Sequence, residues 1–287
     1  MGRGQNTESC STHWLLRAPD HLGDAIMAEP AIAALCKRYT CTIVGPAFCT
    51  ELYAHLPSIE GTAKQIVLFK PSTAEAIRCL HYARRVGLGR RWLLSDSVAS
   101  QPGHRIENLN RIAQYLNAQP HRPPIFPASG ETPPLPNTFA LFIVGTASPE
   151  TVLWDKYNEL AGAVNIDVVF AGGPGDEATV ERLGKGHHKL PTTLSLGSFA
   201  SVARKASWVI GSDCGLMHLA CAARPDSDHH FVIIGSTDPE QTAPTNAQAI
   251  VGTQPLCWPC YRKRCTQNRQ CLDTPTEIVL KRINQCL

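Results

Sequence analysis

The chain has 287 residues, of which 43% are hydrophobic and 18% charged, a composition that excludes disorder and fibrous repeats. At roughly 150 residues per domain, the length predicts two domains. The net charge of +3 is too small for a general nucleic-acid binder. No apolar run approaches the ~18 residues of a membrane span, and the opening residues lack the apolar core of a signal peptide. We therefore expect a cytoplasmic protein.

The first half alternates strand and helix patterns. Short apolar runs predict strands at residues 13–18, 41–45 and 65–69, and apolar residues at helical spacing predict helices at 25–39, 74–86 and 105–116. Residues 1–131 carry 14 Lys and Arg against 10 Asp and Glu, an excess that favours anionic partners. The arginine doublets at 84–85 and 90–91 either serve such partners or are solvated helix ends.

Proline is concentrated in residues 120–136, which hold seven of the 22 prolines. Proline fixes φ and removes a hydrogen-bond donor, so this density predicts a semi-rigid linker. The predicted organisation is a first domain over residues 1–119, the linker, and a second domain over residues 137–287.

The second half repeats the alternation. Strands are predicted at 139–145, 166–173, 207–213 and 229–236, and helices at 154–164, 176–186, 198–206 and 215–223. A terminal helix within 274–287 either stays with this domain or crosses back to the first. Strands that alternate with helices predict an α/β fold with parallel sheets, whose ligands bind in a cleft at the carboxyl ends of the strands.

One candidate site follows the first predicted strand. Leu22, Gly23 and Asp24 stand between that strand and a helix, where Gly23 permits a tight turn. Asp24 is either the N-cap of the helix or a catalytic carboxylate, and the residue types alone do not separate the two. Asp20 and His21 beside it are polar residues that a turn does not require.

A second candidate site lies where a strand ends at Gly211 and a helix begins near Gly215. The free N–H groups at the start of that helix suit a diphosphate. Asp213 is expected to bond a hydroxyl or to order the turn. His218 either reaches a phosphate oxygen or is a core histidine, and its spacing favours the core.

Two further strand ends carry polar residues. The glycine-rich turn FAGGPGDE is not a dinucleotide fingerprint, because its glycines have the wrong spacing. Asp176 and Glu177 in it either bind a ribose diol or start the next helix. Thr237 and Asp238 follow the strand at 229–236 and are expected at the same edge of the sheet.

Five of the twelve cysteines lie in the last 31 residues. Four of them could hold a structural zinc or iron as thiolates, with free thiols and disulfides as the alternatives: Cys257, Cys260, Cys265 and Cys271.

Four segments in order, RAPDHLGDAIMAEPAIAAL, VIGSDCGLMHLACA, IIGSTDPEQTAP and CWPC with the cysteines after it, resemble the signatures of glycosyltransferase family 9. These are the ADP-heptose:lipopolysaccharide heptosyltransferases, and PDHLGDAIM is most similar to the heptosyltransferase II branch. The resemblance implies a GT-B fold, in which two Rossmann-like domains face a central cleft. It also implies metal-independent, inverting transfer from ADP-heptose to the lipopolysaccharide inner core, with peripheral contact at the inner face of the membrane.

The resemblance assigns roles to single residues. It makes Asp24 the catalytic base, places Asp176 or Glu177 near the adenosine, and assigns the donor phosphates to Asp213, Cys214, Gly215, Leu216 and His218. The chain departs from the family twice. Cys214 replaces a threonine, and Val152 replaces a lysine for which Lys156 is the candidate substitute. The acceptor-side candidates are His21, Gly23, Arg90, Arg91 and His104.

Two other functions compete with this one. A GT-B module that binds a nucleotide sugar or a partner without turnover is favoured by Val152 and Cys214. A metal–thiolate module that binds nucleic acid is disfavoured, because only Trp258 and Tyr261 could stack bases beside its basic residues. Those basic residues are Arg262, Lys263, Arg264 and Arg269.

Overall fold

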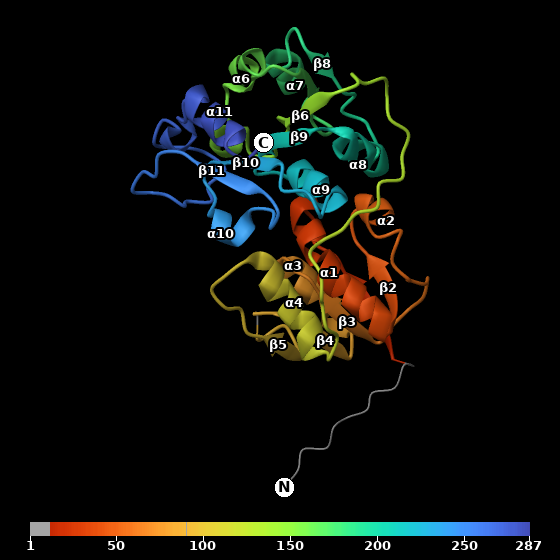
Figure 1. Cartoon of the computed structure of the whole chain (residues 1–287). Coiled ribbons are helices and arrows are strands. Elements are labelled where there is room, and N and C mark those ends of the chain that lie inside the picture. Colours follow the sequence, from red (N-terminus) through yellow and green to blue (C-terminus); the bar gives the residue numbers. More distant parts are fainter. Residues whose placement is uncertain (1–11, 90) are drawn as a thin grey trace. The chain divides into compact units, whose positions relative to one another are not determined.

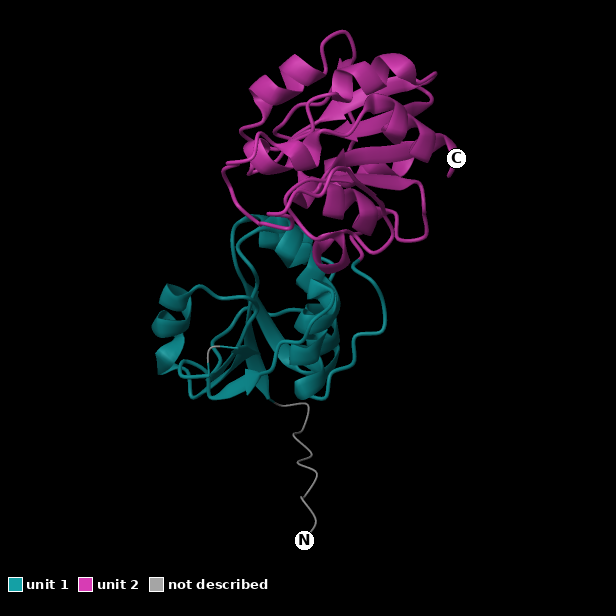
Figure 2. Cartoon of the chain, turned by 90° about the vertical axis from the view of Figure 1, so that its left-hand side faces the viewer, with its two compact units in different colours: residues 1–124 teal, residues 125–287 magenta. Residues whose placement is uncertain are grey.

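A computed structural model describes residues 12–89 and 91–287. The chain divides into two compact units, unit 1 up to residue 124 and unit 2 over residues 125–287 (Figure 2). The boundary falls inside the proline-rich segment. Each unit has its own parallel sheet, so the prediction of an α/β fold is confirmed.

Unit 1 contains a five-stranded parallel sheet in the order β2-β1-β3-β4-β5 (Figure 1). Its strands are β1 (His13–Arg17), β2 (Thr40–Val44), β3 (Gln65–Leu68), β4 (Arg84–Leu88) and β5 (Asp96–Val98). Its helices are α1 (Leu22–Arg38), α2 (Phe48–Leu52), α3 (Thr73–Arg78), the 3₁₀ turn η1 (Cys79–His81) and α4 (Arg105–Tyr115).

Helix α1 is buried on nearly every side. It packs along α4, and every residue from Asp24 to Cys36 is buried. Pro30 lies inside it and removes one helical hydrogen bond, a loss that the surrounding packing tolerates. With 17 residues α1 is the longest described helix, and no helix in the described ranges is long and apolar enough to cross a bilayer.

The helix predicted at 74–86 is wrong in its second half. Ser72 and Glu75 form a capping box that starts α3, but the chain leaves the helix after η1 and enters β4. Val86 of β4 is fully buried in the sheet, between β3 and β5. Strand pairing therefore overrides the helical spacing of this segment.

Unit 2 contains a six-stranded parallel sheet in the order β11-β10-β9-β6-β7-β8. This is the strand order of a Rossmann fold, in which the chain moves outward from β6 in one direction and then from β9 in the other. Its strands are β6 (Phe139–Ile143), β7 (Asp167–Ala171), β8 (His188–Lys189), β9 (Trp208–Ser212), β10 (His230–Ile234) and β11 (Gln248–Val251).

The helices of unit 2 pack on this sheet, and the terminal helix is one of them. They are α5 (Pro149–Val152), α6 (Tyr157–Ala163), α7 (Glu177–Leu183), α8 (Leu196–Lys205), α9 (Gly215–Ala223), α10 (Pro239–Thr242), η2 (Gln270–Leu272) and α11 (Thr276–Asn284). Val279 and Ile283 of α11 join Trp154 and Tyr157 in the core of unit 2. The alternative in which this helix crosses to the first domain is therefore wrong.

The proline-rich segment is held to both units. Both terminal nitrogens of Arg122 lie 2.6 Å from the carboxylate of Glu29, which is only 1% exposed. Beyond the boundary, the Phe126 N–H donates to the carbonyl of Ala222 and its ring is buried. Each part of the segment is thus packed against the unit to which it belongs.

Candidate active site

The topology of unit 1 creates a site beside Asp24. The chain runs from β1 to one side of the sheet and from β3 to the other, so the loops after these neighbouring strands diverge. A crevice at such a switch point is the usual ligand site of an open α/β sheet. Asp24 follows β1 and Lys70 follows β3, so both stand at this point.

Asp24 is not the helix cap that its position suggested. His21 is the N-cap residue and makes no side-chain capping bond, while Asp24 lies inside the first turn of α1. Its carboxylate is 8% exposed and faces Lys70 Nζ at 2.5 Å and Arg105 at 3.4 Å. Two cations offset the cost of withdrawing a carboxylate from water, so Asp24 is fixed in place by contacts that a helix cap does not need.

Lys70 and Arg105 were not singled out from the sequence. Lys70 adopts a left-handed backbone conformation, with φ of 57°. A non-glycine residue in this region costs about 1 kcal/mol or more and is found preferentially at functional sites. Its side chain stays 49% exposed, so the ammonium can contact both Asp24 and a ligand. The only sequence signal was its place directly after a predicted strand.

The acceptor-side candidates are not all brought to this point. His21 is exposed and Gly23 half-buried, both in the loop that leads into α1. His104 is the N-cap of α4, and its Nδ1 accepts the Ile106 N–H, so the ring has a capping role. Arg91 lies exposed after β4. Arg90 lies outside the described residues.

Unit 2 has its switch point between β6 and β9, where α9 begins. Cys214 is the N-cap of α9, and its side chain makes no capping bond. Burial raises the pKa of this thiol to about 12, so it is a neutral thiol. Gly215 and Leu216 in the first turn are half-buried. The amide N–H groups at the start of this nine-residue helix suit an anion.

Asp213 links the α9 turn to the loop after β10. Its carboxylate accepts hydrogen bonds from Thr237 at 2.6 Å and Thr242 at 3.0 Å, and it lies 3.7 Å from the imidazole of His218. Burial alone would raise the pKa of Asp213, but His218 and the two hydroxyls outweigh it and lower that pKa. His218 is 6% exposed. Both side chains therefore order the turn, and a contact of His218 with a donor phosphate stays a prediction.

Asp176 joins the loops after β6 and β7. Its carboxylate accepts the N–H groups of Gly173 at 2.9 Å and Thr146 at 3.3 Å. Burial raises its pKa despite those bonds. Glu177 is exposed, and its carboxylate accepts the Thr192 hydroxyl at 2.7 Å, which lowers its pKa. Of the two, Glu177 presents its carboxylate to solvent.

Lys156 does not point to the phosphate turn. Its ammonium lies 3.4 Å from the Thr274 carbonyl and 3.5 Å from Asp273, in the segment before α11. Val152 is buried. The structure therefore gives the substitution of Lys156 for the missing family lysine no support.

The structure places the four C-terminal cysteines in the segment between β11 and α11. Across residues 12–89 and 91–287, no group of three or more His, Cys, Asp or Glu side chains has the arrangement that a metal needs. Cys265 Sγ accepts the N–H groups of Gln267 and Arg269. Burial, and secondarily the neighbouring Cys265, raise the pKa of the Cys271 thiol. The zinc or iron that these cysteines could hold therefore finds no support in this arrangement, in which the four are free thiols.

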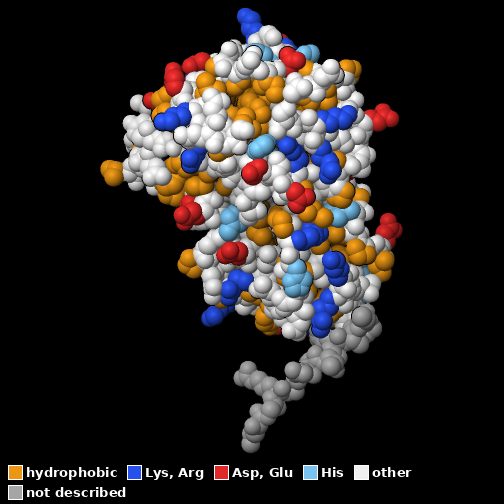
Figure 3. Space-filling model, in the orientation of Figure 1, with side chains coloured by type: hydrophobic (Ala, Val, Ile, Leu, Met, Phe, Trp, Pro, Cys, Tyr) orange, Lys and Arg blue, Asp and Glu red, His pale blue; other side chains and the backbone are white. Residues whose placement is uncertain are grey.

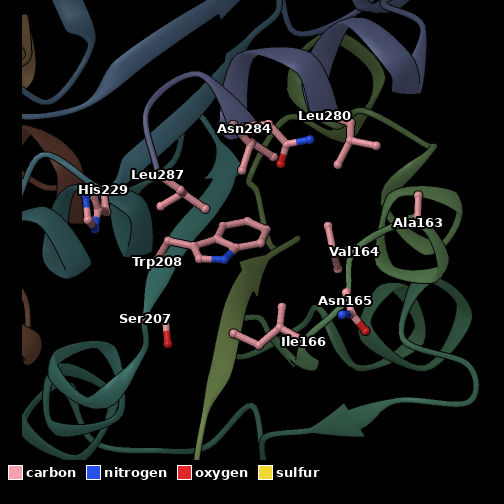
Figure 4. A pocket seen from close by; sticks show the side chains of 11 residues that line it. Ala163, Val164, Asn165, Ile166, Ser207, Trp208, His229, Leu280, Asn284 and Leu287 are labelled. Carbon is pink, nitrogen blue, oxygen red and sulfur yellow. The ribbon is translucent and has the colours of Figure 1, made fainter.

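A cavity of about 650 Å³ lies at the amino ends of strands β7 and β9 in the unit 2 sheet (Figure 4). Trp208 at the start of β9 and residues 163–166 before β7 line it, together with Leu280 and Asn284 of α11. Ligands of open α/β sheets bind at the carboxyl ends of strands. This cavity is therefore separate from the candidate site.

One of the basic residues of the tail is engaged within unit 2. Arg269 forms an ion pair with Asp155 at 2.6 Å and donates to the Leu153 carbonyl. On the face shown in Figure 3, Lys and Arg side chains are dispersed among acidic and neutral ones. That face presents no continuous basic surface among the described residues, so the nucleic-acid alternative finds no support there.

The comparisons with known proteins concern the family and the fold of the chain. The family model for glycosyltransferase family 9 (heptosyltransferase) matches residues 111–270. No curated protein matches the sequence. The structure is similar to that of E. coli ADP-heptose lipopolysaccharide heptosyltransferase II, with 17% sequence identity over 96% of this chain and 98% of that one and a TM-score of 0.74. It is also similar to a family 9 glycosyl transferase from Veillonella parvula, with 15% identity over 98% and 99% of the two chains and a TM-score of 0.78. A third similar structure is E. coli heptosyltransferase WaaC with ADP-2-deoxy-2-fluoro heptose, with 16% identity over 96% and 99% of the two chains and a TM-score of 0.69.

These likenesses cover both units and confirm the GT-B type of fold. The family model matches more than half of the chain. The chain therefore belongs to glycosyltransferase family 9, the heptosyltransferases, and is a glycosyltransferase.

Proposed function

We propose that this chain transfers a heptosyl group from ADP-heptose to the inner core of lipopolysaccharide, with inversion at the anomeric carbon. The observation that carries the proposal is the buried carboxylate of Asp24 between two cations at the switch point of unit 1. The E. coli structure with a fluorinated ADP-heptose supports the donor class. We place this protein in the cytoplasm, peripheral to the inner face of the membrane.

In the proposed mechanism, Asp24 accepts the proton of an acceptor hydroxyl while that oxygen attacks the anomeric carbon. The attack comes from the face opposite the diphosphate, which leaves with the bonding electron pair as ADP. A positioned base of this kind contributes about 10²–10⁴-fold to the rate. Lys70 and Arg105 orient the carboxylate and supply positive charge for a phosphorylated acceptor.

Unit 2 supplies the donor side of the proposal. The N–H groups at the start of α9 receive the diphosphate and stabilise the charge that builds up on it as it leaves. Asp213 and Asp176 hold the loops that shape this surface, and Glu177 is the exposed carboxylate available to a ribose diol. None of these steps uses a metal or a cofactor.

A module that binds a nucleotide sugar without turnover is the second candidate. It is favoured by the orientation of Lys156 toward Thr274 and by the buried Val152, which leave the position of the family lysine without a cation. The two candidates share donor binding and differ in turnover.

A pair of measurements tests the proposal. Thermal unfolding with ADP-sugars and with UDP-sugars identifies the donor, because a ligand that binds the folded state raises the melting temperature. Transfer to heptose-deficient lipopolysaccharide, followed by mass spectrometry and by the anomeric configuration of the product, tests turnover. Stabilisation by ADP-heptose without transfer would favour the binding module.

A further inference from the structure

One edge of unit 1 carries large apolar side chains in contact with solvent. Trp92 is 74% exposed, Leu80 49% and Ile77 48%. Ile77 lies on α3, Leu80 in η1 and Trp92 in the turn between β4 and β5. Apolar side chains of this size are ordinary when scattered singly, so their grouping is the informative point.

Arg85 holds these segments together. Its guanidinium donates to the carbonyl of Tyr82 at 2.6 Å and to that of Leu93 at 3.0 Å, and approaches the carbonyl of Leu80 at 3.5 Å. Beneath it, Leu94 belongs to the same small core as Cys79 and Tyr82. Leu80 and Trp92 are therefore neighbours in space, although 12 positions apart in the chain, and are fixed there by one side chain.

The charge around these residues has one sign. Arg78 and Arg91 are exposed, and neither forms an ion pair with any described residue. The acidic groups nearby are already neutralised, because Glu75 pairs with Arg17 and Asp96 pairs with Arg84 at 3.2 Å. The edge thus combines apolar bulk with uncompensated positive charge.

We propose that this edge patch, Ile77, Arg78, Leu80, Arg91 and Trp92, docks the protein on an anionic lipid bilayer. Aliphatic and tryptophan side chains enter the boundary between headgroups and acyl chains, where an indole is favourable, and the arginines contact the anionic headgroups. The proposal rests on the proposed function, because a lipid-linked acceptor is presented at such a surface.

The patch follows the candidate site in the chain and lies toward the other end of the strands. Lys70, beside Asp24, lies two residues before Ser72, the cap of α3, and the patch begins on the far part of that helix. Six helical residues span about 9 Å. Arg85, which bonds the carbonyls of Tyr82 and Leu93, is the second residue of β4, so the patch lies toward the amino ends of β3 and β4, whereas Lys70 follows the carboxyl end of β3.

Co-sedimentation with large unilamellar vesicles tests the proposal. The full chain is expected to pellet with vesicles of phosphatidylcholine and phosphatidylglycerol in equal parts, and the bound fraction should fall as salt is added. Pure phosphatidylcholine vesicles should bind it several-fold less. A chain that does not pellet with the anionic vesicles at low salt overturns the proposal.

Two variants locate the surface. Leu80→Ser with Trp92→Ser should lower the partition coefficient by about tenfold or more, because both insertions are lost, and Arg78→Gln with Arg91→Gln should remove the dependence on anionic lipid. The matched control is Ile59→Ser, an equally exposed apolar residue beyond β2 at the other edge of the sheet. If both folded double variants bind anionic vesicles as the wild type does, or if Ile59→Ser loses as much binding as they do, the assignment of membrane binding to this patch is wrong.

The assay needs neither donor nor acceptor, so it is separate from the test of function. If the chain binds anionic vesicles but transfers no sugar, the membrane-binding proposal is supported and the proposed reaction is contradicted. If the chain transfers sugar to a soluble acceptor but does not bind anionic vesicles, the proposed reaction is supported and the membrane-binding proposal is contradicted.

Discussion

The ammonium of Lys70 lies 2.5 Å from the carboxylate of Asp24, across 46 positions of the chain. The contact joins the loops after β1 and β3, which leave the sheet in opposite directions. A carboxylate that is 8% exposed would be costly without such a partner. The pair therefore explains how a buried Asp24 is tolerated, and it sets a cation beside the proposed base.

Asp24→Asn should lower the transfer rate by roughly 10²–10⁴-fold, because it removes the base and keeps the side-chain shape. Donor affinity should hardly change, since the nucleotide is proposed to bind unit 2. Steady-state transfer and the thermal shift with ADP-heptose measure the two effects. Because Asp24 is not the helix cap, a near-normal rate in a folded variant would refute its role as base.

Replacements of Lys70 separate backbone strain from charge. Lys70→Gly should be more stable than Lys70→Ala by about 1 kcal/mol, since glycine adopts the left-handed conformation at little cost. Both variants lose the cation, so both should show the same fall in kcat/KM for a phosphorylated acceptor. Denaturant unfolding and acceptor titrations provide the measurements. Full activity in Lys70→Gly would show that only the backbone matters.

Asp213→Asn should destabilise unit 2 by about 1–3 kcal/mol, the usual cost of leaving buried partners imperfectly bonded. Thr237, Thr242 and His218 all face the lost charge. Since they order the turn before α9, the Kd of the donor should rise more than kcat falls. Calorimetric titration with ADP and single-turnover transfer distinguish the effects, and an unchanged donor Kd would contradict this role.

Gly145→Ala tests the junction around Asp176. A Cβ on Gly145 would lie 2.1 Å from the Asp176 carboxylate, so the loop after β6 must shift, at a cost of about 1–3 kcal/mol. The donor Kd should rise with it. Gly162→Ala in α6 is the matched control, because its Cβ meets no atom within 4 Å and should stabilise by about 0.5–1 kcal/mol. If Gly145→Ala and Gly162→Ala have the same stability and the same donor Kd, the proposed role of the contact between Gly145 and Asp176 is wrong.

His230 should make unit 2 sensitive to acid. Burial, aided by the charge of Arg224, lowers the pKa of this fully buried imidazole from 6.5 to about 4. Between those values the unfolded chain binds the proton and the folded chain does not, so stability falls as the pH drops from about 6.5 to about 4, by up to about 3 kcal/mol. Unfolding curves of the wild type and of His230→Gln across this range should diverge in slope.

The sequence by itself determined the fold class and the order of the motifs. Alternating strand and helix periods required parallel sheets, and parallel strands place Asp24, Asp176, Asp213 and Thr237 at carboxyl edges whatever the detailed packing. Those inferences depend only on local pattern and on the handedness of the crossovers. The proline content of residues 120–136 marked the region in which the two units separate.

Only the tertiary structure decided which side chains meet. Lys70 and Arg105 reach Asp24 from positions 46 and 81 residues away, and no local signal in the sequence encodes such a contact. The turn from helix to strand at Arg84 depended on pairing with β3 and β5, which outweighed helical spacing. The sequence showed that Lys156 could bind phosphate and that the four C-terminal cysteines could bind a metal. Packing decided where these side chains point, because the direction of a side chain depends on the neighbours that the fold places around it.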